Sequence, residues 1–190
     1  MALRDAIMAT LASGEASGYD LSKRFDVGVA NFWTATRQQL ARELDKMEQE
    51  GLIRARVVEQ ERRPTKRVFA LTDAGHAAIF AFSLHEPRPS AIRDDLLVQV
   101  ETVSLGDLHS IRRSIVARRA LSVSKLAGYE RAHERLRGTL THDEYLSAGE
   151  RIGPYLTLLR GILFERENLR WCDIAAEALD RPAEPWGKSA

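Results

Sequence analysis

Cysteine is almost absent from this chain of 190 residues, whose one cysteine is Cys172. A single thiol excludes a disulfide within the chain and any metal site built from several cysteines. Long apolar runs are missing as well, since none reaches the roughly 20 residues that a membrane-spanning helix needs. Arg4 and Asp5 interrupt the short apolar stretches at the start of the chain. We therefore expect no secretory signal, no membrane partner and a cytoplasmic location.

An excess of one charge is also lacking. The 28 basic and 27 acidic side chains leave a formal net charge of +1. This balance excludes a non-specific polycation, so a nucleic-acid partner would have to bind a local patch. The 44% of hydrophobic residues are enough for a real core in one or two domains.

The residue patterns of common catalytic and metal sites are missing too. The five histidines are scattered, without the i, i+4 pairing and nearby carboxylate that a helical zinc site requires. No glycine-rich phosphate loop follows a strand, and no nucleophile elbow occurs. We predict a protein that is not an enzyme and that needs no cofactor and no metal.

The most informative feature that is present is a basic hairpin between two strand-like runs, 52–60 and 66–71. Residues 52–70 contain six basic and only two acidic side chains. The turn contains Pro64, which suits a loop rather than a paired strand. Adjacent cations repel one another, whereas a nearby polyanion would compensate them and release counterions. The hairpin predicts contact with DNA, and an ordinary soluble surface turn is the alternative.

A helix is expected directly before the hairpin, over 36–50. Thr36 followed by Gln39 fits a capping box, and Gly51 fits the left-handed residue that ends a helix. Three apolar residues recur at helical spacing and must face the core: Leu40, Leu44 and Met47.

The opposite face of this helix carries side chains suited to a DNA groove. At about 100° per residue, Gln38 and Arg42 point almost opposite the core, while Gln39 and Lys46 occupy one flank and Arg37 the other. Arginine and glutamine near the start of an exposed helix can make paired hydrogen bonds to guanine and adenine edges in the major groove. An ordinary solvated face is the alternative.

Helical spacing and turn signals predict the other elements of a first domain, 1–84. Helices are expected over 2–11 and 19–25 before the helix described above, and over 76–84 after the hairpin. Ser17 is a candidate cap for the second of them. The order of helices and hairpin is that of a winged helix-turn-helix domain, with three helices and a two-stranded wing.

Pro87 and Pro89 mark a linker over 85–90, because proline disfavours helix in itself and in the residue before it. Beyond it, 91–178 is predicted to be an α-helical dimerisation domain, so the fold class is mainly α. Its apolar stripes are too wide for two long helices to bury on each other, which favours a homodimer. Helices are expected over 92–103 and 107–137, and Thr141 and Glu144 form a second capping box that opens another helix. Pro154 should start a new segment or kink that helix, and a flexible tail is expected over 179–190.

These residues resemble a known family. The runs GYDLSKRF (18–25), FWTATRQQLARELDKMEQEGLI (32–53) and KRVFALTDAGHAAI (66–79) are similar to the winged-helix domain of PadR-like transcriptional regulators. The later half is similar to the helical dimerisation domain of that family's longer-tailed, virulence-activator-like subgroup. The resemblance implies a dimer whose third helices enter successive major grooves of duplex DNA while the wings touch the flanking backbone.

The function predicted from residues and resemblance together is a sequence-specific regulator of transcription that binds double-stranded DNA as a homodimer and represses its target. The resemblance assigns base or phosphate contacts to several of the candidate positions. This chain departs from the family's pattern at Ala41, where the family commonly has tyrosine. The candidate DNA-binding residues are Tyr19, Thr36, Arg37, Gln38, Gln39, Arg42, Lys46, Arg62, Arg63, Thr65, Lys66 and Arg67.

Two other functions stay open at this point. The winged helix can serve as a scaffold that docks an acidic protein partner on the hairpin without binding an operator. The protein can also sense a small aromatic effector, because Trp33 and Trp171 are suited to line a pocket for planar compounds. Structural packing is the favoured role for both tryptophans.

Overall fold

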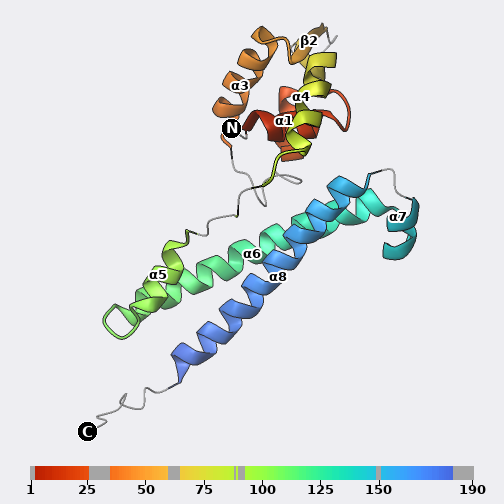
Figure 1. Cartoon of the computed structure of the whole chain (residues 1–190). Helices are drawn as coiled ribbons and strands as arrows, with labels where there is room; N and C mark the ends of the chain where they lie inside the picture. The colour runs from red at the N-terminus through yellow and green to blue at the C-terminus, as the bar shows by residue number, and fades with distance from the viewer. Residues whose placement is uncertain are drawn as a thin grey trace. The chain divides into compact units, whose positions relative to one another are not determined.

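The structure is a computed structural model. It describes residues 3–25, 35–59, 65–87, 89, 93–148 and 151–181. The chain divides into two compact units, Met1–Arg88 and Pro89–Ala190 (Figure 1). The predicted Trp33, the hairpin residues Arg62 and Arg63 and the tail from residue 182 onward lie outside the described residues.

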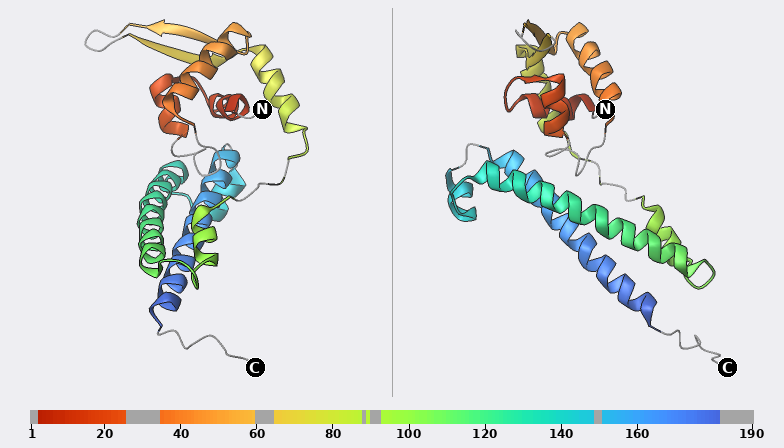
Figure 2. Two further views of the ribbon diagram at one scale, coloured as in Figure 1. Left: turned by 90° about the vertical axis from the view of Figure 1, so that its left-hand side faces the viewer. Right: turned by 180° about the vertical axis from the view of Figure 1, so that it is seen from behind.

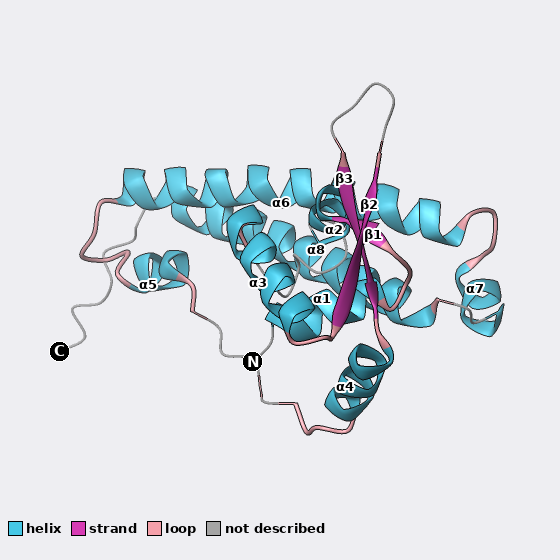
Figure 3. Ribbon diagram, turned by 90° about the horizontal axis from the view of Figure 1, so that it is seen from above, coloured by secondary structure: helices cyan, strands magenta, loops and turns pink. Residues whose placement is uncertain are grey.

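The first unit combines helices with a small antiparallel sheet whose strand order is β1-β3-β2 (Figure 3). Seen from the side, β2 and β3 project beyond the helices of this unit (Figure 2). The predicted winged-helix fold class is confirmed. The elements are α1 (Leu3–Leu11), β1 (Ala16–Ser17), α2 (Gly18–Arg24), α3 (Arg37–Gln49), β2 (Ile53–Val58), β3 (Lys66–Leu71) and α4 (Asp73–Ser83).

The two predicted strands of the wing, β2 and β3, are present, and the sheet has a third strand, β1, that was not predicted. Ala16 pairs with Phe69 and Ser17 with Val68. A strand of two residues is too short to show an alternating pattern, and its partner lies more than 50 positions away in the sequence. The segment was expected to be a loop that caps the next helix. The segment is a strand and also provides the predicted cap, since Ser17 accepts a hydrogen bond from the amide of Asp20 in α2 at 3.1 Å.

Local capping chemistry sets the ends of the helices. Thr36 and Gln39 form the predicted capping box at the start of α3, and Gly51 has the predicted left-handed backbone, with a φ of +73°. The helix predicted over 76–84 begins three residues earlier. The hydroxyl of Thr72 accepts from the amide of Gly75 at 3.1 Å and thereby caps α4.

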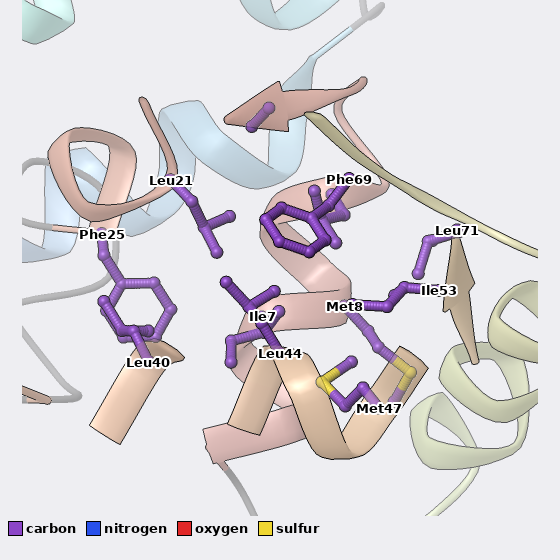
Figure 4. Close-up of a cluster of buried hydrophobic side chains, with 12 residues drawn as sticks. Ile7, Met8, Leu21, Phe25, Leu40, Leu44, Met47, Ile53, Phe69 and Leu71 are labelled. Atoms are coloured by element: carbon purple, nitrogen blue, oxygen red, sulfur yellow. The ribbon is translucent and has the colours of Figure 1, made fainter. Parts of the chain in front are cut away.

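The core of the first unit lies between α1, α2 and α3 and the inner face of the sheet (Figure 4). The predicted core residues of α3, Leu40, Leu44 and Met47, are all buried, as are Ile7 and Met8 of α1. This burial fixes the rotation of α3 about its own axis, so the face opposite these three residues must point to solvent.

The second unit is built on two long antiparallel helices, α6 and α8, which lie side by side (Figures 1 and 2). The predicted capping box of Thr141 and Glu144 is present, and a new helix begins just before Pro154, as expected. Among the described residues no helix is both long and apolar enough to cross a membrane. The elements are α5 (Asp95–Glu101), α6 (Leu108–Arg137), α7 (His142–Ala148) and α8 (Ile152–Asp180).

Apolar packing and ion pairs hold these helices together. Cys172 is fully buried with Ile111 and Ile115, and Trp171 packs against the same cluster. The predicted packing role of Trp171 is therefore confirmed. Arg119 of α6 reaches Asp173 of α8 at 2.7 Å, one of several exposed cross-links between the two helices.

Candidate nucleic-acid interface

The solvent face of α3 begins with a group of unpaired polar side chains. Arg37, Gln38 and Arg42 are exposed, and none of the three has a hydrogen bond or ion pair to another described residue. Their positions follow from the buried stripe behind them and from the capping box that starts the helix at Arg37. Guanidinium and amide groups held in this way are free to make paired hydrogen bonds to base edges.

Thr36 and Gln39 are also exposed, but their polar atoms are already in use. The side-chain oxygen of Gln39 accepts from the amide of Thr36 at 2.8 Å, and the hydroxyl of Thr36 accepts from the amide of Gln39 at 3.2 Å. Paired recognition of adenine needs both a donor and an acceptor from one side chain. Because its oxygen is held by the amide of Thr36, the side chain of Gln39 is less free than that of Gln38 to supply both, although its NH₂ group remains a donor.

Lys46, in the last turn of α3, shares a carboxylate with the first helix. Its ammonium lies 3.9 Å from Glu50, which also pairs with Arg4 of α1 at 2.8 Å. The hydrogen bond to Glu50 is the main cause of a raised pKa for Arg4, and Glu43 adds to it. This group of charges braces α1 against α3 and so supports the pose of the solvent face.

On α2, Tyr19 stands out from the surface with 61% of its area exposed. The ammonium of Lys23 lies over its ring, 4.5 Å from the ring centre. Lys23 was not among the predicted site residues. Its spacing of four from Tyr19 places both side chains on one helix face, which is the signal that would have identified it.

The strands of the hairpin carry basic residues of two kinds. Lys66 pairs with Val58 at the end of the described ladder, next to Thr65, and makes no ion pair with a described residue. Arg54 makes none either. The remainder of the predicted tip, which contains Arg62 and Arg63, lies outside the described residues.

Arg67 and Arg56 already hold acidic partners outside the hairpin. The guanidinium of Arg67 reaches Asp45 of α3 at 2.8 Å and also pairs with Glu48, while it lies 5.0 Å from the ring centre of Phe69. Arg56 pairs with Glu15 at 2.8 Å, and this hydrogen bond lowers the pKa of the Glu15 carboxyl. Part of the positive charge that the sequence concentrates in the hairpin is therefore neutralised in space.

A helix with free guanidinium and amide groups, followed by a basic two-stranded hairpin on one compact core, is the arrangement of a winged helix-turn-helix protein. Comparison with known families agrees with it. Residues 7–81 match the transcriptional regulator PadR-like family, and residues 92–180 match the virulence activator alpha C-terminal family. The chain belongs to the PadR-like family of transcriptional regulators.

Relatives of full length support this membership. A protein of Mycobacterium tuberculosis named a probable transcriptional regulator is 36% identical over 189 residues, which cover 94% of this chain and 98% of the relative. The negative transcriptional regulator PadR of Bacillus subtilis is 26% identical over 183 residues and covers 94% of this chain and 98% of its own.

Solved structures of the same B. subtilis protein share the fold. Its crystal structure in complex with operator DNA matches with a TM-score of 0.74 at 25% identity, covering 92% of this chain and 97% of the other. Its complex with p-coumaric acid matches with a TM-score of 0.66 at 23% identity and covers 94% and 99%. This chain is thus a regulator of the DNA-binding, winged-helix type.

Proposed function

We propose that this protein is a sequence-specific regulator that binds duplex DNA as a homodimer and represses transcription. In this proposal residues 1–84 bind DNA and residues 91–178 join the two copies. The observation that carries it is the solvent face of α3, on which Arg37, Gln38 and Arg42 have no partner among the residues that the structure describes.

In this proposal some residues contact base edges and others contact phosphates. The first turns of α3 enter the major groove, where Arg37 and Gln38 contact base edges and Arg42 and Lys46 contact the walls of the groove. Gln39 contributes as a donor, and Thr36 fixes the start of the helix. The remaining residues hold the DNA backbone: Tyr19, Arg62, Arg63, Thr65 and Lys66.

Arg67 has a different role in this proposal. Its two carboxylate partners lie on α3, so the side chain holds the base of the hairpin at a fixed position relative to that helix. Ion pairs exposed to this extent stabilise a fold by only about 0.2–1 kcal/mol each. Their contribution is to the geometry of the interface more than to its charge.

The homodimer is supported by an unburied apolar face on α8. Leu156, Leu163 and Ile174 are 47%, 53% and 57% exposed. Their spacings of seven and eleven residues place all three on one side of the helix, at about 100° per residue. Exposed apolar residues aligned on one side of a helix are a feature of helix–helix interfaces. A second copy would cover it with the same face, as twofold symmetry requires.

The decisive experiment is a gel shift with the upstream region of the protein's own gene at several salt concentrations. We expect a discrete complex that survives competitor DNA and weakens steeply as salt rises. Repression predicts that deletion of the gene raises expression from that promoter. Binding that is equally strong on unrelated duplexes would contradict sequence-specific regulation, and no binding at low salt would favour a protein-docking role for the hairpin.

A second candidate function is the sensing of a small aromatic effector. It is favoured by the relative that was crystallised with p-coumaric acid, and by a cavity in the second unit of this chain. Binding of an effector would act on transcription if it changed the affinity for DNA, which is a coupling between two distinct sites.

A further inference from the structure

The short helix α7 is attached to the end of the α6–α8 pair by aromatic side chains (Figure 2). Tyr145 is the one buried residue of α7, and its ring stacks on that of Tyr155 of α8 with 4.5 Å between the ring centres. At the first position of α7, Nδ1 of His142 lies 2.7 Å from the hydroxyl of the same tyrosine. Tyr155 is fully buried. Both of these contacts of α7 therefore depend on one ring that α8 holds in place.

By itself α7 is too short to be a stable helix. It spans seven residues, and an isolated helix of that length is marginal in water. A capping box of Thr141 and Glu144 stabilises only its start. Before it, α6 ends at Gly138, whose φ of +62° is rare for residues other than glycine. The packing on Tyr155 therefore supplies the stability that α7 lacks alone.

His133 of α6 contacts the same tyrosine from another helix. The centre of its ring lies 4.3 Å from that of Tyr155, and its Nε2 atom is buried without a hydrogen-bond partner among the described residues. A neutral imidazole with its proton on Nδ1 leaves only an unused acceptor at this position. A protonated imidazole would instead place a charge and a donor there, away from water and without an acceptor. The aromatic cluster formed by His133, His142, Tyr145 and Tyr155 therefore favours the neutral form of His133.

The charges around His133 act in the same direction. Burial is the main cause that lowers the pKa of its imidazole, and the charges of Arg137, His142 and Arg166 lower it further. Glu134 acts in the opposite direction. The charged or titratable groups of the elements packed around this ring are Glu130, Glu134 and Arg137 of α6, His142 and Tyr145 of α7, and Tyr155 and Arg166 of α8, of which Arg166 pairs with Glu130 at 2.7 Å.

We propose that α7 is held by an acid-sensitive contact, so that protonation of His133 releases α7 from the end of the helix pair. While His133 is neutral, Tyr145 and His142 hold α7 on Tyr155. The charged imidazole needs water or an acceptor at Nε2, and the aromatic cluster opens to provide it when α7 leaves. Because the proton binds more weakly while α7 is docked, proton uptake must weaken docking by the same factor. This release does not rest on the proposed binding of DNA.

The lowered pKa of His133 fixes the direction of the pH dependence. Above the ordinary histidine pKa of about 6.5, the ring is neutral whether α7 is docked or free, so docking has its full strength. As the pH falls below that value, the free form takes up a proton that the docked form takes up only at a lower pH. Docking of α7 therefore weakens on acidification.

The first test is hydrogen exchange of the full chain, followed by mass spectrometry at about pH 7.5 and about pH 5.5, with rates corrected for the intrinsic effect of pH. We expect the amides of α7 to lose about threefold or more of their protection at the lower pH, while those of α3 in the first unit keep theirs. His133→Phe keeps an aromatic ring and removes the titrating group, so its α7 should be equally protected at both pH values. Equal protection in the wild type would overturn the proposal, as would an unchanged loss in His133→Phe.

The second test measures the same coupling from the proton. An NMR titration of the imidazole of His133 gives its pKa in the wild type and in Tyr145→Ala, which removes the stack on Tyr155. This pKa should lie below the ordinary value in the wild type and return towards it in Tyr145→Ala. Ser147→Ala, an exposed change on the same helix, should titrate like the wild type.

Because His133 stays in place, the NMR titration remains decisive even if His133→Phe does not fold. Circular dichroism checks that Tyr145→Ala retains the long helices. If the folded Tyr145→Ala protein shows the same pKa of His133 as the wild type, docking of α7 and protonation are not coupled and the proposal is wrong.

Discussion

Arg37 and Gln39 are two positions apart on α3, but their side chains have different freedom. Arg37 has no partner among the described residues, whereas the oxygen of Gln39 is occupied by the amide of Thr36. A side chain that already completes a capping box cannot change partners without releasing that amide. Base recognition by α3 should therefore depend on Arg37 and its exposed neighbours more than on Gln39.

Replacement of Arg37 by alanine tests this assignment. Arg37→Ala should weaken operator binding by about 1–3 kcal/mol and relax the sequence preference, because a paired contact to a base edge is lost. Competition gel shifts with singly substituted operators measure both effects. Gln49→Ala, an exposed change at the far end of the same helix, serves as the control. Equal affinity and selectivity for Arg37→Ala and wild type would remove Arg37 from the reading face.

Lys66 and Arg67 are adjacent in sequence and form a matched pair for the wing. Lys66→Ala should flatten the dependence of log K on log salt by about one, as the loss of one phosphate contact does. Arg67→Ala should change this slope by clearly less, since Asp45 and Glu48 already hold its charge. Fluorescence anisotropy at several salt concentrations gives both slopes. Equal slopes for the two variants would mean that Arg67 releases its carboxylates to contact DNA.

At the scale of helices and strands, Gly75 is required because the backbone of Leu52 lies close to it. A Cβ atom at Gly75, in the first turn of α4, would lie 2.1 Å from the carbonyl oxygen of Leu52. Gly75→Ala should lower the free energy of unfolding by about 1–3 kcal/mol, because backbone atoms have to move. Gly128→Ala in α6, where a Cβ meets nothing within 4 Å, should instead raise it by about 0.5–1 kcal/mol. Denaturant unfolding followed by circular dichroism distinguishes the two, and a neutral Gly75→Ala would refute the close approach.

A charged pair attaches α5 to α6 and makes that attachment depend on pH. Asp94 caps α5 and accepts two hydrogen bonds from Arg118, at 2.7 and 2.8 Å. The Arg118 guanidinium is the main cause that lowers the pKa of the Asp94 carboxyl. Because this pKa is lower in the folded state, the pair stabilises the fold above the ordinary aspartate pKa, and the gain is lost as pH falls through the folded value.

Asp94→Asn tests this dependence, because it keeps a side-chain acceptor for the cap and removes the charge. At neutral pH the variant should be less stable by about 1 kcal/mol, and the difference should vanish in strong acid. Unfolding midpoints measured across the acid range give the comparison. Asp173→Asn, which breaks an exposed pair with Arg119, is the control and should show no comparable pH-dependent difference. A constant penalty for Asp94→Asn at every pH would show that only the cap matters.

Elements whose signals are local could be predicted from the sequence, and those that depend on distant partners could not. The residues that form the capping boxes at Thr36 and Thr141 lie within four positions of one another in the sequence. The signal that ends α3 at Gly51 is equally local. Strand β1 escaped prediction because only its pairing with Phe69 and Val68 makes it a strand.

The candidate site shows the same division. The spacing of Leu40, Leu44 and Met47 was enough to predict which face of α3 is free. The neutralisation of Arg67 by Asp45 and Glu48 could not be predicted, because it depends on where β3 lies beside α3. A surplus of charge along the sequence is thus only an upper limit to the charge that a folded hairpin offers to DNA.

At the scale of the whole molecule, the proposed function requires two copies to act together. A single α3 reads only a few base pairs, and joining two reading helices makes the second contact intramolecular. The exposed face of α8 is the surface that would join them. It belongs to the second unit, so changes there should affect DNA binding without altering any residue of the first.

Leu163→Glu places a charge at the centre of this apolar face. We expect the variant to be monomeric by sedimentation, because burying an unpaired carboxylate against a second copy is strongly unfavourable. Its helix content should be unchanged, since Leu163 is half exposed in the single chain. Operator affinity should fall steeply as the coupling of half-sites is lost. Phe80→Glu, a change at a more exposed apolar position on α4 of the first unit, should stay dimeric. A dimeric Leu163→Glu would assign the joining surface to another face of the chain.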